Sequence, residues 1–160
     1  MSRPRRAAWL RVLGLAVAAG LQCAPAQASL GGDVASVEHD RMRLQGQRRA
    51  VAQSSVHVQT HLLVLGDGSV IKEYLGPAGT VFAVSWSTRF KPRLDELLGT
   101  QADAYAQAAR EAMRRPGIRH AVALERGDLV VHAHEHLTSH VGLAYLKSQL
   151  PPGVGVDALH

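Results

Sequence analysis

The run from Glu73 to Trp86 constrains the fold of this chain more than any other stretch. It reads Glu-Tyr-Leu-Gly-Pro-Ala-Gly-Thr-Val-Phe-Ala-Val-Ser-Trp, the densest set of strand-forming residues in the sequence, interrupted once by glycine and proline. Proline presets φ at the second position of a turn, and glycine adopts positive φ at no steric cost. The run therefore predicts two antiparallel strands joined by a tight turn, in the middle of a sheet.

The residues on either side extend this hairpin. Residues 55–65 alternate between a valine-rich face and a face with His57, Gln59 and His61, which predicts a half-buried strand. Gly66-Asp67-Gly68 is typical of a turn, so residues 69–75 and 80–86 follow as the second and third strands of a meander. Three apolar side chains of the third strand are expected to share a face that a helix covers: Phe82, Val84 and Trp86.

Helical spacing occurs before and after the meander. Residues 33–45 predict a short helix with Asp33 as its N-cap and Gly46 at its end, and the polar residues 45–54 are expected to form a loop. Pro92 suits the first turn of a later helix that ends at Gly99.

A second, longer helix is predicted to start directly after Gly99. Thr100 with Asp103 is a variant of the capping box, and Pro116-Gly117 ends the helix. Its apolar stripe is expected to pack on the sheet. The stripe consists of Ala102, Tyr105, Ala106, Ala109 and Met113.

A second hairpin is predicted over residues 119–126 and 129–136, with a last strand over 141–146. The fold class is therefore α+β: an antiparallel sheet of about five strands, built from the meander and the second hairpin, with two or three helices packed on one face. The predicted organisation is a leader at 1–28, a short helix and loop at 29–54, a single α+β domain at 55–150 and a tail at 151–160.

The leader has the pattern of a secretory signal peptide. Arginines precede the apolar run Val12–Leu21, and Ala26-Gln27-Ala28 fits the small-x-small rule for cleavage after Ala28. The run is shorter than the roughly 20 residues that a spanning helix needs. We therefore expect a periplasmic or secreted mature protein with no integral membrane segment.

Removal of the leader changes the charge of the chain. Four of its 18 basic residues and none of its 13 acidic ones precede Ser29, which leaves 14 basic residues against 13 acidic ones. This balance gives no electrostatic reason to expect nucleic acid or an anionic membrane as a partner. The one cysteine, Cys23, is lost with the leader, so no disulfide is expected.

Several short motifs recur in an order and spacing typical of one family. They are Leu30-Gly31-Gly32, Lys72-Glu73-Tyr74, the run Gly79 to Trp86, Leu97-Leu98-Gly99, Leu129-Val130-Val131, Gly142-x-Ala144-Tyr145-Leu146 and Leu150-Pro151-x-Gly153-Val154. Over nearly all of its mature part the chain resembles a proteobacterial family of exported proteins, domain of unknown function 2844. The resemblance implies a bacterial, exported, single-domain protein and brings no activity, cofactor or catalytic residue. Leu143 stands where that family often has arginine.

Histidines on the second hairpin suggest a metal site. His132, His134 and His136 alternate along the predicted strand, so their imidazoles share a face, and His140 follows. Next-but-one Cα atoms of a strand lie about 6.6–7 Å apart, so two imidazoles could converge on one Zn²⁺ or Cu²⁺, with a third ligand from elsewhere. The alternative is that these histidines form the solvated face of an edge strand.

The sequence contains no assembled catalytic motif. Ser69-Val70-Ile71-Lys72 matches Ser-x-x-Lys, but residues three apart on a strand point to opposite faces. Trp86 and Tyr74 could form an aromatic binding surface, although a lone tryptophan in a central strand is more often core. We therefore expect a non-enzymatic periplasmic or secreted module that binds an envelope or secreted protein. The alternative is a metal-binding protein that uses the His132 to His140 cluster.

Overall fold

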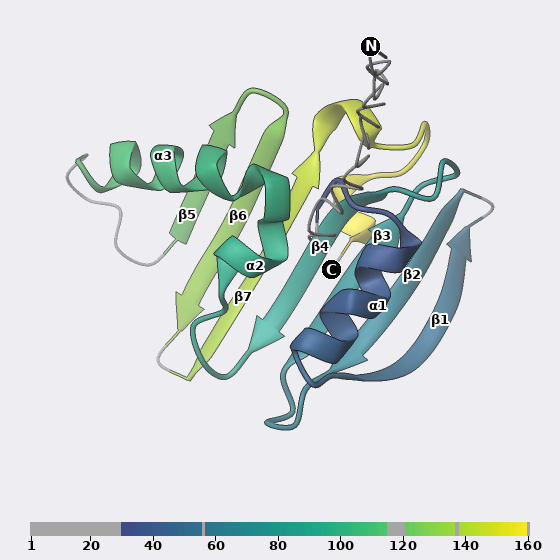
Figure 1. Cartoon of the computed structure of the whole chain (residues 1–160). Helices are drawn as coiled ribbons and strands as arrows, with labels where there is room; N and C mark the ends of the chain where they lie inside the picture. Colours follow the sequence, from purple (N-terminus) through teal and green to yellow (C-terminus); the bar gives the residue numbers. More distant parts are fainter. Residues whose placement is uncertain (1–29, 56, 115–120, 137, 160) are drawn as a thin grey trace, which may run out of the picture.

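The described residues form one antiparallel sheet of seven strands in the order β1-β2-β3-β4-β7-β6-β5 (Figure 1). This computed structural model describes residues 30–55, 57–114, 121–136 and 138–159, so the predicted leader lies outside the described residues. The strands are β1 Gln47–Ser55, β2 Val58–Val64, β3 Val70–Leu75, β4 Val81–Thr88, β5 Ala121–Arg126, β6 Leu129–His136 and β7 Ser139–Leu146.

Helices cover one face of this sheet. In Figure 1, α1 lies in front of β2 and β3, and α3 crosses β5 and β6. The helices are α1 Val34–Arg43, α2 Leu94–Leu98 and α3 Ala102–Met113, with 3₁₀ turns η1 Gly99–Gln101, η2 Lys147–Gln149 and η3 Val156–Ala158. The predicted antiparallel sheet with helices on one face is confirmed. Within the described part of the chain, no helix is long and apolar enough to cross a membrane.

The expected number of strands, about five, is too small, and the loop predicted over residues 45–54 is wrong. Most of that segment is β1, an edge strand that pairs with β2 from Gln47↔Val64 to Ser55↔Val58. Its sequence is polar and does not alternate, so the pairing to β2 creates this strand rather than any local pattern. Two register shifts interrupt the pairing, as is common on sheet edges.

A bulge in β4 turns Phe82 to the far face of the sheet. The register of β3 with β4 shifts between Tyr74 and Leu75, which leaves Phe82 as an extra residue on β4. A bulge interrupts the alternation of side chains. Val84 and Trp86 therefore face the helices as predicted, whereas Phe82 packs on the far face, so the prediction that all three share a face is wrong for Phe82.

Each face has its own core. The larger core lies between sheet and helices and begins with Leu30, whose backbone N–H donates to the carbonyl of Leu97 (3.3 Å). The smaller core lies on the far face, where the C-terminal segment 150–159 covers part of the sheet. Its buried members are Val58, Tyr74, Phe82, Ala83, Leu143 and Leu159.

The ends of the helices differ in part from the predictions. Asp33 caps α1 as expected, since its carboxylate accepts from the Ser36 N–H (2.9 Å). The left-handed residue that ends α1 is Gln45 (φ 51°) rather than Gly46, whose N–H donates to the Arg41 carbonyl as in a Schellman motif.

The start of α3 also differs from the prediction. The capping box of Thr100 and Asp103 is wrong, because η1 runs directly into α3 and Ala102 N–H donates to Gly99. Tyr105 and Ala109 pack on the core as predicted, but Met113 is 81% exposed.

Trp86 packs closely over Gly142 at the centre of the sheet. They are paired on β4 and β7, and a Cβ on Gly142 would overlap Trp86 Cζ2 and lie 2.7 Å from the carbonyl oxygen of His132. Real Cβ contacts are never this short, so the indole occupies the space that a side chain at position 142 would fill. Glycine is required here by close packing.

Substitution of Gly142 by alanine is expected to displace the Trp86 indole and lower the free energy of unfolding by about 1–3 kcal/mol, as overpacked cores do. Urea denaturation checks this. Gly66→Ala is the control, because a Cβ there meets nothing within 4 Å. Equal losses for the two variants would contradict the packing described.

Candidate functional site

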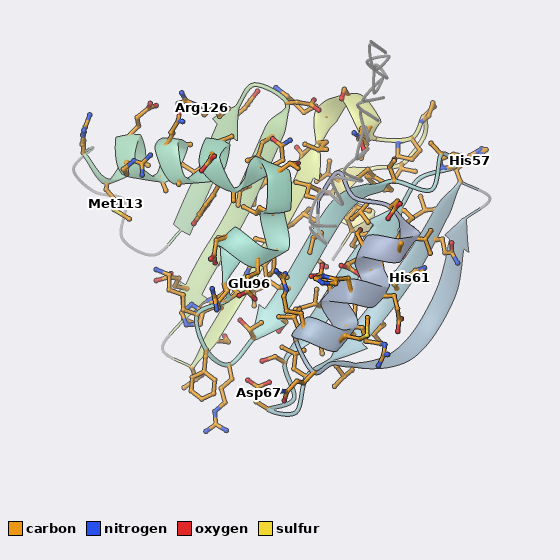
Figure 2. The ribbon with its side chains drawn as sticks, in the orientation of Figure 1. His57, His61, Asp67, Glu96, Met113 and Arg126 are labelled. Atoms are coloured by element: carbon orange, nitrogen blue, oxygen red, sulfur yellow. The ribbon has the colours of Figure 1, made fainter. Side chains whose placement is uncertain are left out.

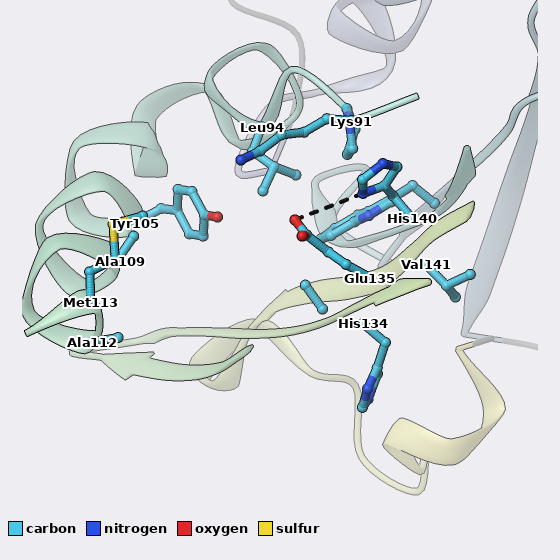
Figure 3. A pocket seen from close by; sticks show the side chains of 13 residues that line it. Lys91, Leu94, Tyr105, Ala109, Ala112, Met113, His134, Glu135, His140 and Val141 are labelled. Carbon is cyan, nitrogen blue, oxygen red and sulfur yellow. Dashed lines mark ion pairs between the residues drawn. The ribbon is translucent and has the colours of Figure 1, made fainter. Parts of the chain in front are cut away.

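A cavity of about 110 Å³ lies between the helices α2 and α3 and the strands β4, β6 and β7 (Figure 3). We call it the Trp86 cavity. Its apolar lining includes Trp86, Leu94, Ala109, Ala112 and Ala133, and its ionisable lining includes Lys91, Tyr105, Glu135 and His140. A cavity of about 150 Å³ holds a benzene molecule, so this one fits a single small apolar group.

Glu135 and His140 bring polar chemistry to this cavity. They are cross-strand partners on β6 and β7, and His140 Nδ1 lies 3.8 Å from Glu135 Oε1. Both side chains face the helices and lie at the cavity in Figure 3, because Glu135 shares its face with Ala133. His140 Nδ1 is buried and has no hydrogen-bond partner among the described residues.

Tyr105 closes the opposite side of the cavity from α3. Its hydroxyl points across the cavity toward Glu135 in Figure 3. Burial, and then the negative charge of Glu135, raise the pKa of Tyr105 above its usual value. The phenol therefore stays neutral at neutral pH and is available as a hydrogen-bond donor.

The predicted histidine cluster lies mainly on the other face of the sheet. His132, His134 and His136 are exposed, and His132 stacks on the ring of Tyr145 (centroids 6.4 Å apart). His134 is among the residues that line the Trp86 cavity, but Figure 3 shows its ring pointing away from Glu135 and His140. In the described segments no group of three or more potential ligands is placed to hold a metal ion. The metal site at His132, His134 and His136 stays a prediction.

Trp86 and Tyr74 are each 3% exposed. The core assignment of Trp86 is thus confirmed, and neither ring forms an open aromatic surface. Trp86 lines the Trp86 cavity, and Tyr74 lines a separate cavity on the far face. Any contact of these rings with a ligand must therefore take place inside a cavity.

Comparison with known proteins now assigns the family. The family described as "Protein of unknown function (DUF2844)" matches residues 26–159. The chain belongs to this family. No curated protein and no solved structure matches it. Membership in DUF2844 confirms the resemblance expected from the motifs.

The structure of this DUF2844 protein also contains a buried polar cluster that the sequence did not suggest. Asp40 of α1, His61 of β2 and Glu73 of β3 are each at most 2% exposed. His61 lies opposite Glu73 because the hairpin turn is centred on Asp67. Figure 2 shows His61 beside α1. The expectation that His61 lies on a polar, half-buried face is therefore wrong, because α1 covers it.

The pairing of His61 with Glu73 could have been predicted from the symmetry of the hairpin. A turn centred on Asp67 pairs positions whose numbers are equally distant from 67, and His61 and Glu73 satisfy this. Two ionisable side chains paired on one strand face predict a shared environment. The position of α1 above them could not be read from the same pattern.

Opposing effects act on the pKa of Asp40. Burial raises its pKa, while the guanidinium of Arg43 (2.7 Å) and a hydrogen bond with Glu73 act in the other direction, and the pKa stays above its usual value. A hydrogen bond between two buried carboxyl groups requires a proton on one of them. Protonation of one member of this pair therefore favours the contact between α1 and the sheet.

This predicts a pH dependence of stability that Asp40→Asn should remove. The folded state holds the Asp40 proton more tightly than the unfolded state, whose usual pKa is 3.8. The contribution of Asp40 is therefore full below pH 3.8 and is lost as the pH rises through the folded pKa. Relative to Asp40→Asn, the wild type should lose stability as the pH rises in urea denaturation. A stability difference between the two proteins that is constant with pH, or that grows in favour of the wild type, would refute this. Asp103→Asn, on the exposed side of α3, is the control.

The geometry of the Trp86 cavity predicts a change at Tyr105. Glu135→Gln removes the negative charge, so the pKa of Tyr105 should fall while staying above its usual value, because burial is the larger cause. Ultraviolet absorbance titration measures it, and Tyr105→Phe identifies the transition that belongs to this residue. An unchanged Tyr105 pKa would show that Glu135 does not face the hydroxyl.

Proposed function

We propose that this protein is an exported, non-enzymatic binding module, and that its Trp86 cavity receives one apolar side chain of an envelope protein. The observation that carries the proposal is the buried His140 Nδ1, which has no hydrogen-bond partner among the described residues and sits beside an apolar cavity. Buried polar atoms are normally hydrogen-bonded, so such an atom favours an incoming segment whose backbone supplies the bond beside the apolar side chain that fills the cavity.

The shape of the cavity supports a side chain rather than a large cofactor. Cavities that enclose cofactors and drug-sized ligands measure about 300–1,000 Å³, and this one is about 110 Å³. Apolar anchors that fill small pockets, surrounded by polar groups, are typical of the central contacts of protein interfaces. Glu135, with a side chain 49% exposed, and the exposed Lys91 supply such a polar rim.

The lining residues support binding rather than catalysis. A carboxylate beside an imidazole can activate a hydroxyl or a thiol. Among the described lining residues the one hydroxyl is that of Tyr105, whose raised pKa disfavours ionisation. The Glu135–His140 pair is therefore interpreted as a hydrogen-bonding element of a binding site.

Export is supported by the leader and by the position of Leu30. Cleavage after Ala28 would leave Leu30 as the second residue of the mature chain. Leu30 is 1% exposed, and the next residue, Gly31, donates its N–H to the Val81 carbonyl (2.8 Å). A mature chain that begins at Ser29 would therefore retain every residue that the described fold uses at this end.

Blocking the cavity tests the proposal. A photo-crosslinking residue in place of Lys91 should give a discrete adduct in the native envelope fraction. Ala112→Trp should abolish that adduct, because Ala112 lines the cavity, while Gln107→Trp on the exposed side of α3 should preserve it. Thermal unfolding of both variants confirms that they fold. An adduct that survives Ala112→Trp, or no adduct in the unblocked protein, would refute the proposal.

A further inference from the structure

A second, larger cavity lies on the far face of the sheet, beneath the C-terminal segment. We call it the tail cavity. Its volume is about 230 Å³, and its walls come from the ends of β2 and β3 and from residues 152–159. Val58, Tyr74, Val154 and Leu159 supply apolar side chains, and the exposed His57 lies at the cavity. None of these residues lines the Trp86 cavity.

The space exists because the tail presents little side-chain volume there. Gly153 and Gly155 both line the cavity, and a Cβ added at either would meet nothing within 4 Å. Gly153 has a φ of 80° and needs glycine for its backbone, whereas Gly155 has an ordinary φ of −78°. The glycine at 155 is thus required neither by its backbone conformation nor by a close contact.

The tail is attached in a way that allows it to move. Its described backbone hydrogen bonds are local: Val154 to Pro151, Ala158 to Gly155 and Leu159 to Val156, at 3.0–3.1 Å. Its attachment to the sheet is apolar, through the buried Pro151 and Leu159. A segment without described backbone hydrogen bonds to the sheet can open by local unfolding, at a cost set by the apolar contacts of Leu150, Val154, Val156 and Leu159 that it breaks. The wall of the cavity can therefore separate from the sheet while the sheet stays intact.

We propose that the tail cavity is a binding site for a small apolar group of about nine carbon atoms, admitted by displacement of residues 152–159. The size follows by proportion, since a cavity of about 150 Å³ binds benzene and this one is about 230 Å³. Protein interiors are close-packed, so a cavity of this size between apolar walls is filled favourably by an apolar ligand.

The walls limit the chemistry of the ligand. The Tyr74 hydroxyl is 3.3 Å from Ser85 Oγ and shares a hydrogen bond with it, so the ring presents an apolar surface to the cavity. His57 is the residue of this lining that can carry a positive charge. A bicyclic aromatic ring and a medium acyl chain share the required apolar chemistry, and an acyl carboxylate would in addition meet His57.

Titration of the full mature chain with naphthalene and, separately, with octanoate tests this by methyl NMR. The methyl signals of Val58, Val154 and Leu159 should shift with saturation, while those of Val131 in the larger core should not. If the site prefers an acyl carboxylate, His57→Ala should weaken the binding of octanoate and leave that of naphthalene unchanged. If the site prefers an uncharged ring, His57→Ala should weaken the binding of neither probe. Both results support an apolar site.

Cavity-filling variants decide whether the shifts come from the tail cavity. Val58→Phe and Ala158→Phe fill it from the sheet and from the tail, and both should abolish the shifts of the Val154 methyls. Val64→Phe, on the same strand and face as Val58 but outside the cavity, should leave them unchanged. Because Val58 is buried, Ala158→Phe keeps the test valid if Val58→Phe does not fold. No saturable shift with either probe, or shifts that survive Ala158→Phe, would overturn the proposal.

Discussion

The contact of the Trp86 indole with Gly142 is the constraint on which the rest of the structure depends. β4 ends the first meander and β7 returns from the second hairpin, so their pairing joins the two halves of the sheet. At the Trp86–Gly142 pair the indole fills the space above a residue with no side chain. The same ring forms a wall of the Trp86 cavity, so packing at the centre of the sheet and the geometry of the candidate site are linked through one residue.

The bulge at Phe82 turns this aromatic side chain to the far face of the sheet. Without the extra residue, Phe82 would continue the alternation of Val84 and Trp86 and face the helices. Turned to the far face, it joins Tyr74 and Leu143 and makes an apolar surface that the C-terminal tail covers. The tail covers this surface incompletely, and the tail cavity is what remains. The bulge and the Trp86–Gly142 contact in β4 thus each shape the packing of the sheet.

The polar cluster under α1 has a different part in the fold. Asp40, His61 and Glu73 are buried between α1 and the sheet, a place where most proteins bury apolar side chains. Such clusters add less stability than apolar packing but impose strict geometry, because each polar group requires its partner. Asp40 also holds Arg43, which lies within 3.9 Å of Glu96 at the start of α2. The cluster therefore connects α1 to the sheet and, through Arg43, to the next helix.

The sequence by itself determined the elements whose side chains repeat locally. Alternation and tight glycine turns predicted the strands of the meander. Asp33 predicted the start of α1, because its side chain bonds to a backbone N–H only three residues further along. Family membership was also readable from short motifs.

Tertiary structure decided what depends on partners distant in the chain. β1 is a strand because β2 pairs with it, Phe82 faces away from the helices because of a bulge, and His61 is buried because α1 lies above it. The histidines that the sequence emphasised, His132, His134 and His136, lie on the open face, while the polar pair at the Trp86 cavity is Glu135 with His140. The physical reason is twofold: side chains alternate between the two faces along β6, and its register with β7 places His140 opposite Glu135 on the face that the helices cover.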